Sequence, residues 1–523
     1  MESIEKSTED TVRQRKQNHS LDQTVLKENG AAHGHVKCLV EWKKHMEVVK
    51  AEIVETMSSQ MKDLLDKAVE DTLQSYTRDN VASVPDKKLR NEDSGRGKIF
   101  KARASLVDEL MEVEHFRTIY HMFAAAFCVF VISTVAVDSI DQGRLVLEFD
   151  LFFYSFGQTS TVVWSWTCLF IYTLLVPYKI LHFWGSRFSK SKHPFLLSAS
   201  VISIFGICQF CVLGIFPTYI VLHYKLPPAS SFIVTLEQVR FVMKSYSFLR
   251  ETVPSVIRKE RNPDQLPKLS SYLYFLFCPT LIYRDSYPRT PYIRWNYVVK
   301  NFAQFLACVF FLNFTFVTLC IPVFTNMIKQ PLNIRTMVLS VFHATLPGTF
   351  FLLTSFFALL HCWLNAFAEM LRFADRMFYK DWWNSKSFSN YYRTWNVVIH
   401  DWLYYYVYQD ILWLCNRRFR TGAMLAVFFM SAIVHEYALT LSLGYFYPVM
   451  FCLFAIFGVV FNFFINDTLT CPLWNVVLWT FLFIGQGIQL CLYCQEWYAR
   501  KHCPLTEKTF WGLVTPRSWS CQI

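Results

Sequence analysis

The stretch that decides the fold begins Phe378-Tyr379-Lys380-Asp381-Trp382-Trp383-Asn384, continues Asn390-Tyr391-Tyr392-Arg393-Thr394-Trp395-Asn396, and ends at His435-Glu436. His435 lies about halfway along an apolar run, residues 422–445, that is long enough to span a bilayer as a helix. An ionisable side chain at that depth is costly, and it indicates a functional role. The alternative is a buried histidine that is hydrogen-bonded to a neighbouring helix, and helix geometry leaves both interpretations open.

Composition places the whole chain in the membrane class. Of its 523 residues, 53% are hydrophobic and 18% aromatic, and the apolar residues occur in long runs. These runs predict an all-α polytopic membrane protein. The net charge of +11 lies largely in the loops, as expected of Lys and Arg on the cytoplasmic side of a membrane protein, so we expect no nucleic-acid partner.

The first hundred residues are polar and differ from the rest. Residues 1–35 are predicted to be a disordered tail without the apolar core of a signal peptide. Residues 36–75 show apolar side chains at helical spacing, namely Leu39, Trp42, Met46, Val49, Ile53, Met57, Met61, Leu64 and Ala68. We interpret this segment as a cytosolic oligomerisation helix, with packing against its own membrane domain as the alternative. Residues 76–104 are interpreted as a linker.

A membrane domain is predicted for residues 105–498, with an amphipathic start over 105–121. About nine spans are expected, at residues 120–138, 157–181, 195–222, 231–249, 301–325, 337–367, 423–445, 446–466 and 473–496. The fourth span contains Glu237, Arg240 and Lys244, whose charges have to face other helices or water. A shorter apolar run at 272–283 is interpreted as an interfacial element.

Charge bias orients this layout. Lys and Arg gather in the loops 182–194, 250–300 and 368–422, which places these loops and the N-terminus in the cytosol. Nine spans then put the tail, residues 499–523, in the lumen. Arg500 and Lys501 directly after the last span instead favour a cytosolic tail, so models with eight or ten spans remain open.

The cysteines suggest one bridge and no metal site. Most of the sixteen lie in apolar runs and are expected to pack as small hydrophobes. Cys503 and Cys521 bracket the polar tail, where a disulfide on an oxidising side would contribute about 3 kcal/mol. The sequence has neither a CxxC…CxxC pair nor an HExxH motif, and Cys208/Cys211 and Cys491/Cys494, which share the short spacing, lie in apolar runs and are expected to pack.

The central stretch suits acyl transfer. A neutral His435 can act as a general base, and Ser431 lies four residues earlier on the same helical face. The sequence lacks a G-x-S-x-G elbow, which favours direct transfer over a serine acyl-enzyme. A polar, phosphate-bearing acyl carrier could be bound from the cytosol by Asn390, Arg393, Asn396 and His400. The tryptophans could equally be interfacial residues, and Arg417, Arg418 and Arg420 only positive-inside charges.

These motifs resemble those of a known superfamily. Phe378, Tyr379, Asp381, Trp382, Trp383 and Asn384 fit the Phe-Tyr-x-Asp-Trp-Trp-Asn signature of the sterol and diacylglycerol branch of the membrane-bound O-acyltransferases. His435 lies where that superfamily carries its intramembrane histidine. Residues 361–373, 389–396, 495–500 and 516–519 resemble the sterol O-acyltransferases, and the similarity covers most of 98–523. The tail, 510–516, is more similar to the type 2 members.

The resemblance implies an endoplasmic reticulum enzyme that esterifies cholesterol with long-chain acyl-CoA as co-substrate, without a cofactor. It implies that His435 is the catalytic base and that Asn396 assists at the thioester carbonyl. Acyl-CoA contacts are implied for Asn390, Arg393, Asn396, His400, Tyr408, Arg420 and Ser431, and sterol contact for His115. It also implies nine spans, a homotetramer (a dimer of dimers) formed through the N-terminal helix, and a luminal Cys503–Cys521 disulfide.

Two other functions remain open from the sequence. An acyltransferase of the same branch could use diacylglycerol as its acceptor. A non-catalytic sterol-binding membrane protein would use His435 as a buried structural or ligand-binding residue. The polar loop 368–422 argues against the second, because a simple sterol binder needs no site for a molecule as large as CoA.

Overall fold

The computed structural model describes residues 97–142, 149–188, 190–258, 266–328, 333–464, 471–504 and 510–521. From Lys98 onward the chain forms one compact unit. The predictions for the tail 1–35, the helix 36–75 and most of the linker 76–104 lie outside the described residues. Residues 98–103 are bound to the membrane domain, where Lys98 pairs with Asp401 at 2.5 Å and Arg103 pairs with Asp375 at 2.9 Å.

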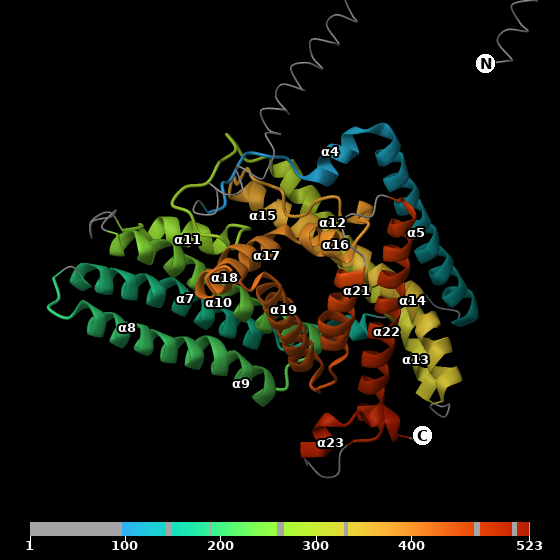
Figure 1. The fold of residues 1–523 in the computed structure, drawn as a ribbon. Helices are drawn as coiled ribbons and strands as arrows, with labels where there is room; N and C mark the ends of the chain where they lie inside the picture. Colours follow the sequence, from blue (N-terminus) through green and yellow to red (C-terminus); the bar gives the residue numbers. More distant parts are fainter. Residues whose placement is uncertain are drawn as a thin grey trace, which may run out of the picture. The chain divides into compact units, whose positions relative to one another are not determined.

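The predicted all-α class is confirmed (Figure 1). In chain order the elements are α4 (Leu106–Glu112), α5 (Glu114–Gln142), α6 (Asp150–Ser155), α7 (Thr159–Phe188), α8 (Pro194–Gln209), η2 (Phe210–Ile215), α9 (Phe216–His223), α10 (Pro228–Ile257), α11 (Leu269–Phe277), α12 (Trp295–Thr315), η4 (Phe316–Cys320), α13 (Ile321–Ile328), α14 (Ile334–Ser355), η5 (Phe356–Trp363), α15 (Leu364–Met370), η6 (Trp382–Asn384), α16 (Phe388–Trp395), α17 (Val397–Trp402), η7 (Leu403–Tyr408), α18 (Gln409–Leu414), α19 (Arg420–Leu443), α20 (Val449–Phe451), η8 (Cys452–Phe457), α21 (Gly458–Phe464), α22 (Leu473–His502), α23 (Phe510–Val514) and η9 (Arg517–Trp519). No strand occurs in these described ranges, since a helix satisfies its own backbone in lipid.

Seven stretches of the described chain are long and apolar enough to cross a membrane. They are Glu114–Val137, Asp150–Phe188, Pro194–His223, Trp295–Met327, Ile334–Met370, Arg420–Leu443 and Leu473–His502. The two remaining predicted spans are also helical, but α10 carries charges and the apolar helix Val449–Phe461 is shorter. The chain is therefore a multi-pass membrane protein, and the number nine stays a prediction.

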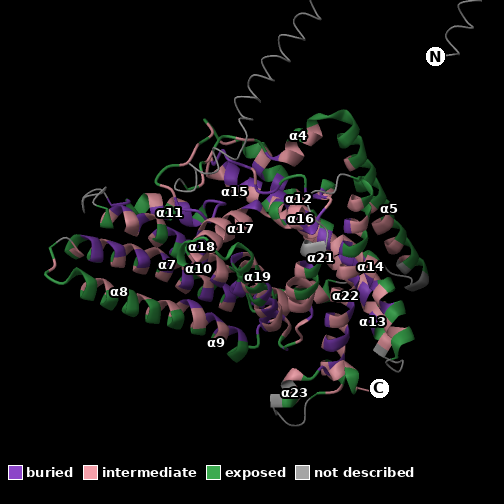
Figure 2. Cartoon of the chain, in the orientation of Figure 1, coloured by how far each residue is buried: buried purple, intermediate pink, exposed green. Residues whose placement is uncertain are grey.

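Lipid-facing and protein-facing helices differ in exposure (Figure 2). On α5, apolar side chains such as Met122 and Phe123 are 65% and 72% exposed, as expected of a surface that faces hydrocarbon. On α7, Leu169 and Leu181 are buried against neighbouring helices. Hydrophobicity alone does not distinguish these two surroundings, because both are apolar.

The charges of α10 face other helices, as expected. Arg240 Nη2 lies 2.6 Å from Glu237 Oε2, and the indole N–H of Trp166 on α7 donates to the same carboxylate at 2.6 Å. Lys244 is buried and donates to three carbonyl oxygens at the end of α11, those of Phe275, Leu276 and Cys278, at 2.6–3.0 Å. A cation at a helix C-terminus is favourable, because the last carbonyls there lack intrahelical partners.

Replacing Lys244 with methionine is expected to destabilise the protein by about 1.5–3 kcal/mol. The substitution keeps the apolar stem but removes the donor that the end of α11 uses. Lys268→Met is the control, because Lys268 is exposed at the other end of α11 and its replacement should stay within about 0.5 kcal/mol. Thermal melting of both variants in one detergent measures the difference, and equal melting temperatures would refute the role of Lys244.

The run 272–283, interpreted as an interfacial element, packs inside the protein. Its first half forms the end of α11, and Tyr272, Phe275 and Leu276 are fully buried. Tyr272 packs on Phe248 of α10 with ring centroids 4.0 Å apart, and its hydroxyl donates to the carbonyl of Thr173 on α7. The run therefore packs between α7 and α10, and its depth in the bilayer stays a prediction.

A buried ion-pair cluster lies just beyond the C-terminal end of the longest predicted span, residues 337–367. Glu369 on α15 is fully buried and binds Arg294 in two places, with Nε at 3.0 Å and Nη2 at 2.9 Å. Arg376, also buried, binds the same carboxylate. In the tail, Cys503 and Cys521 form the expected disulfide, with Cα atoms 5.9 Å apart.

Candidate active site

His435 projects from the C-terminal half of α19, and one of its ring nitrogens is left for proton transfer. Its Nδ1 lies 2.7 Å from the backbone carbonyl oxygen of Ser431, one turn earlier. A carbonyl oxygen can only accept, so Nδ1 carries the proton and Nε2 of the neutral ring carries a lone pair. Ser431 Oγ lies 3.5 Å from the same nitrogen, at the limit of a hydrogen bond. The helix itself thus holds the tautomer that a general base needs.

The imidazole is exposed although it belongs to a spanning helix. One side of it stacks on Phe454 of η8, with ring centroids 5.2 Å apart and planes 20° apart. This contact limits the ring's rotation and leaves its edge accessible. The side chain is therefore held in one orientation and remains open to a ligand.

Glu436, the next residue, faces the protein interior. Its buried carboxylate Oε2 accepts from the Phe451 N–H at 3.1 Å and from the Tyr493 hydroxyl at 2.9 Å. These bonds join α19 to α20 and α22. Because η8 directly follows Phe451, they also hold the segment that carries Phe454 against His435.

Aromatic contacts place α16 beside the segment that carries Phe454, next to His435. Tyr392 of α16 contacts Phe454 at 4.9 Å and Phe428 of α19 at 5.2 Å between ring centroids. Phe454 therefore lies between α16 and His435. The hydrophilic region 368–422, predicted as a loop, consists largely of short helices that pack beside α19.

Three of the predicted polar contacts lie on or directly beside α16, and each also has a local role. The Asn390 amide nitrogen donates to Ser385 Oγ at 3.0 Å. Arg393 is exposed, and its guanidinium donates to Ser389 Oγ at 2.5 Å. Asn396 caps α17, where its Oδ1 accepts from the Ile399 N–H at 3.1 Å. Because the cap uses the oxygen of Asn396, its Nδ2 is the atom that can donate to a ligand.

His400 and Tyr408 lie on one face of a continuous helix, α17–η7. His400 stacks on Tyr404 at 6.2 Å, and Tyr404 stacks on Tyr408 at 5.7 Å. Beside His400, burial would raise the pKa of the Asp401 carboxyl, but hydrogen bonds from His400 and Lys98 hold that pKa below its usual value. This charged group thus stays ionised and ties α17 to Lys98.

The motif residues 378–384 support this arrangement structurally. Phe378, Tyr379 and Trp382 are buried in an aromatic core, and Trp382 packs on Trp395 of α16 at 4.6 Å. The Trp383 carbonyl oxygen accepts from Asn475 and Trp479 of α22 at 2.8 and 3.1 Å. The polar members Asp381 and Asn384 are exposed. The motif therefore joins α16 to α22 and positions the residues that follow it.

Two of the predicted contacts lie apart from His435. Arg420 is the first residue of α19 and is exposed, about 22 Å along the helix axis from His435. His115 is exposed in the first turn of α5. An elongated ligand could contact both Arg420 and His435. None of the described interactions connects His115 to α19.

Phe454, Tyr392 and Glu436 have structural roles at the site that sequence reasoning did not assign. Phe454 is one of 50 phenylalanines, so no sequence signal singles it out. A glutamate within an apolar run is a detectable signal, because a buried carboxylate needs donors. Its position beside His435 draws attention to it, but its partners on α20 and α22 follow only from the fold.

Known proteins resemble this chain along most of its length. The membrane-bound O-acyltransferase family matches residues 149–495. The chain is 55% identical over 500 residues to mouse sterol O-acyltransferase 2, with 94% of each chain covered. It is 56% identical over 489 residues to the human sterol O-acyltransferase 2, with 92% of each covered. Over 430 residues it is 56% identical to mouse sterol O-acyltransferase 1, covering 82% of this chain and 80% of that one.

The chain belongs to the membrane-bound O-acyltransferase family. It is therefore an acyltransferase, and its described helices cross a membrane several times. Within that family, its similarity extends along almost the full length of the sterol O-acyltransferases.

Replacing Glu436 with alanine is expected to lower kcat by up to about 100-fold, because Phe454 would no longer hold His435 in place. Glu436→Gln keeps an acceptor oxygen and should restore most of the rate. KM for acyl-CoA should stay close to the wild-type value in both, which separates a positioning role from a general loss of folding. Steady-state kinetics measure this, and equally inactive Ala and Gln variants would contradict the positioning role.

Proposed function

We propose that this enzyme esterifies the 3-hydroxyl of cholesterol with a long-chain acyl group from acyl-CoA, by direct transfer with His435 as general base. The carrying observation is the hydrogen bond from His435 Nδ1 to the Ser431 carbonyl, since it leaves Nε2 unprotonated on an exposed ring. The acceptor is inferred from the curated relatives, whose names state sterol O-acyltransfer.

The step balances with these residues alone. Nε2 of His435 takes the hydroxyl proton as the sterol oxygen attacks the thioester carbonyl and a C–O bond forms. Asn396 Nδ2 donates to the resulting oxyanion, a type of contact that contributes about 3–4 kcal/mol in studied enzymes. The C–S bond then breaks, and the imidazolium returns the proton to the CoA sulfur. The products are cholesteryl ester and CoA.

Acyl-CoA is proposed to approach from the side of α16–α18. The aromatic face of His400, Tyr404 and Tyr408 offers stacking surface, and Arg420 offers a cation for phosphate. The distance of about 22 Å between Arg420 and His435 suits a long carrier whose charged end and thioester lie far apart. Asn390, Arg393 and Ser431 are the remaining proposed contacts, and His115 is proposed to contact sterol.

A competition assay tests the acceptor. Purified enzyme in nanodiscs receives labelled oleoyl-CoA with cholesterol and diacylglycerol together. Cholesteryl oleate should predominate, whereas preferential formation of triacylglycerol would assign the chain to the diacylglycerol acyltransferases. Binding of sterol without release of CoA would instead support the non-catalytic sterol binder.

The proposed setting is the endoplasmic reticulum, with the N-terminus cytosolic and the disulfide-bonded tail luminal. Support comes from the predicted charge bias and from the Cys503–Cys521 bridge, which needs an oxidising compartment. The chain is further proposed to form a tetramer through residues 36–75. Deleting residues 36–70 should reduce the mass on light scattering and leave acyl-CoA binding intact. An unchanged mass would remove this role.

A further inference from the structure

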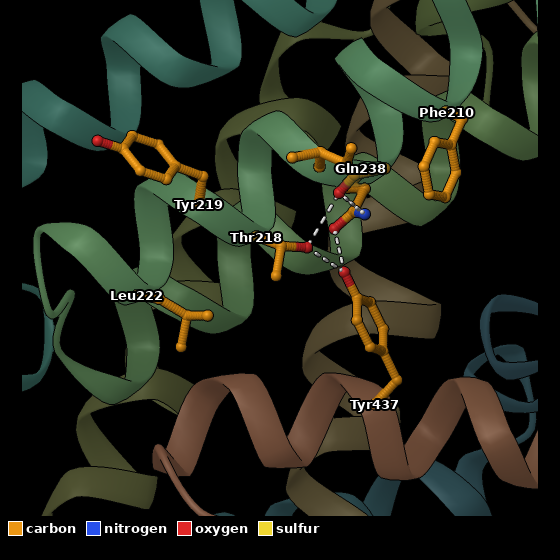
Figure 3. Close-up of a pocket in the computed structure, with 8 residues that line it drawn as sticks. Phe210, Thr218, Tyr219, Leu222, Gln238 and Tyr437 are labelled. Carbon is orange, nitrogen blue, oxygen red and sulfur yellow. Dashed lines mark hydrogen bonds between the residues drawn. The ribbon is translucent and has the colours of Figure 1, made fainter. Parts of the chain in front are cut away.

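Two concave regions on the described part of the chain differ in charge. One is a groove among η2, α9, α10 and α19, where Thr218, Gln238 and Tyr437 point toward one another (Figure 3). None of its lining residues is charged, and the Tyr437 hydroxyl donates to Gln238 Oε1 at 2.9 Å and lies 2.9 Å from Thr218 Oγ1. The other is a hollow of about 470 Å³ at the turn between α18 and α19, and its lining includes Arg417.

The backbone of this turn is fixed in an uncommon conformation. Asn416 and Arg417 have φ angles of 49° and 59°, in the left-handed region that residues other than glycine seldom adopt. The Arg417 N–H donates to the Leu412 carbonyl at 2.7 Å, and the Arg418 N–H donates to the Cys415 carbonyl at 3.1 Å. The chain therefore leaves α18 abruptly and enters α19 after a short, hydrogen-bonded connection.

Large apolar side chains are exposed on both sides of the turn. Trp413 and Leu414 of α18 are 79% and 76% exposed, and Phe419 is 68% exposed. Helix α19 begins at Arg420 and is long and apolar enough to cross the membrane, so the turn lies at the end of a membrane-crossing helix. Exposed aromatic residues at such a position are typical of the boundary between lipid and water.

The same region is cationic. Arg417, Arg418 and Arg420 are exposed, and the sequence from 411 to 435 contains no aspartate or glutamate. The preceding acid, Asp410, is held by other groups, because Arg250 Nη2 lies 2.6 Å from its Oδ1 and the Tyr246 hydroxyl donates to its Oδ2 at 3.0 Å. The turn therefore carries a net positive charge beside exposed apolar side chains.

We infer that this turn binds an anionic phospholipid of the leaflet that borders it, through a surface formed by Trp413, Leu414, Asn416, Arg417, Arg418 and Phe419. We call these residues the α18–α19 surface. Guanidinium groups bind phosphate oxygens in two places, and each arginine near an anionic bilayer strengthens the attraction about fivefold. The volume of the hollow lies in the range of about 300–1,000 Å³ of small-molecule sites. The apolar side chains would then lie among the first carbons of the lipid chains.

A phosphate of CoA, or a free phosphate, offers the same group to these arginines. The apolar side chains favour the lipid, because a phosphate that arrives in water leaves Trp413 and Leu414 exposed to water. A phospholipid instead supplies hydrocarbon directly beside its phosphate, which suits adjacent apolar and cationic side chains. Arg420, proposed above as an acyl-CoA contact, is left out of the α18–α19 surface for this reason.

Photolabelling of the full-length chain in nanodiscs tests the inference. One probe is a phosphatidylserine with a diazirine on its acyl chain near the glycerol, present at a low fraction in phosphatidylcholine. The second probe is a phosphatidylcholine with the same diazirine. Neither acyl-CoA nor sterol is added, so the outcome does not depend on catalysis or on the acyl acceptor. In the wild-type protein, the phosphatidylserine probe should label the segment 409–425 severalfold more than the phosphatidylcholine probe.

The variants separate charge from general contact with lipid. Arg418→Gln should lower labelling by phosphatidylserine about fivefold, and its combination with Arg417→Gln should lower it more than tenfold. Arg418→Lys keeps the charge and should retain most of the labelling. Lys380→Gln is the matched control, since Lys380 is also an exposed cation but has the exposed Asp381 beside it, and its replacement should change nothing at 409–425. Trp413→Ala should lower labelling by both probes, because both lipids use the apolar contact.

Three outcomes would overturn the inference. Equal labelling of the wild-type segment by the two probes would show ordinary contact with lipid and no selection of negative charge. Unchanged labelling in both Arg418→Gln and Trp413→Ala would remove the α18–α19 surface from lipid binding. Loss of labelling on addition of CoA, at a concentration where unlabelled phosphatidylserine does not compete, would assign the arginines to the CoA phosphates. Melting temperatures confirm that each variant is folded.

Discussion

Replacing His435 with alanine is expected to lower the rate of cholesteryl oleate formation by about 10²–10⁴-fold, the usual contribution of a positioned general base. Without Nε2, the sterol hydroxyl has no positioned base, and only water is left to take its proton. The loss should occur in kcat, because the proposed base acts on the reacting hydroxyl and contributes little to holding acyl-CoA. Initial rates with labelled oleoyl-CoA, at equal amounts of protein, measure the effect.

His343→Ala is the matched control for that experiment. His343 is also a histidine of a spanning helix, α14, and is exposed, but it lies outside the candidate site. Its replacement should leave the rate within about twofold, since exposed positions away from a site have small effects. Binding of a fluorescent acyl-CoA should persist in both variants. If His435→Ala keeps the wild-type kcat, another group removes the proton.

Replacing Glu369 with glutamine is expected to destabilise the protein by about 3–5 kcal/mol, the typical result of removing one partner of a buried ion pair. Glu369 is fully buried and binds both Arg294 and Arg376. Without the carboxylate, the buried guanidinium of Arg376 loses its counter-charge, while Arg294 is half exposed and can be hydrated. Thermal melting in detergent should show a lower transition temperature, and the yield of purified protein should fall.

Two further variants establish that the loss arises from the unpaired cation. Removing Arg376 together with Glu369, both as methionine, should recover part of the stability, because no buried charge then remains unpaired. Glu114→Gln is the control, since Glu114 pairs with Arg117 at 3.4 Å but is 86% exposed and should cost less than about 1 kcal/mol. Equal melting of the Glu369 and Glu114 variants would disprove the expected effect.

The sequence located the helices well because hydrophobic length is a local property. Each of the nine predicted spans is largely helical where the structure describes it, and the structure extends some of their ends, as at Trp295 and His502. The charged residues Glu237, Arg240 and Lys244 also behave as expected, since a charge in an apolar helix has to find a partner. Which partner it finds, the end of α11 for Lys244, depends on how distant segments pack.

The candidate site was predictable only in part. His435 and the polar residues of 390–400 could be selected because such groups are costly near lipid. Their local roles could not, since the cap made by Asn396 and the stacking of His400 on Tyr404 depend on where short helices begin and end. The sequence left an interfacial role open for the tryptophans of the signature at 378–384, and three of the aromatic residues of this signature, Phe378, Tyr379 and Trp382, proved to be buried core.

Composition and spacing were sufficient to define an all-α membrane protein with an ionisable residue inside a span, because both depend on the cost of moving single groups into lipid. Only the folded chain decided that Phe454 covers one side of His435, that Glu436 holds the next helix, and that Thr218, Gln238 and Tyr437 meet in one groove. These contacts join residues far apart in the chain. Their partners are chosen by the packing of whole helices, which no local pattern encodes.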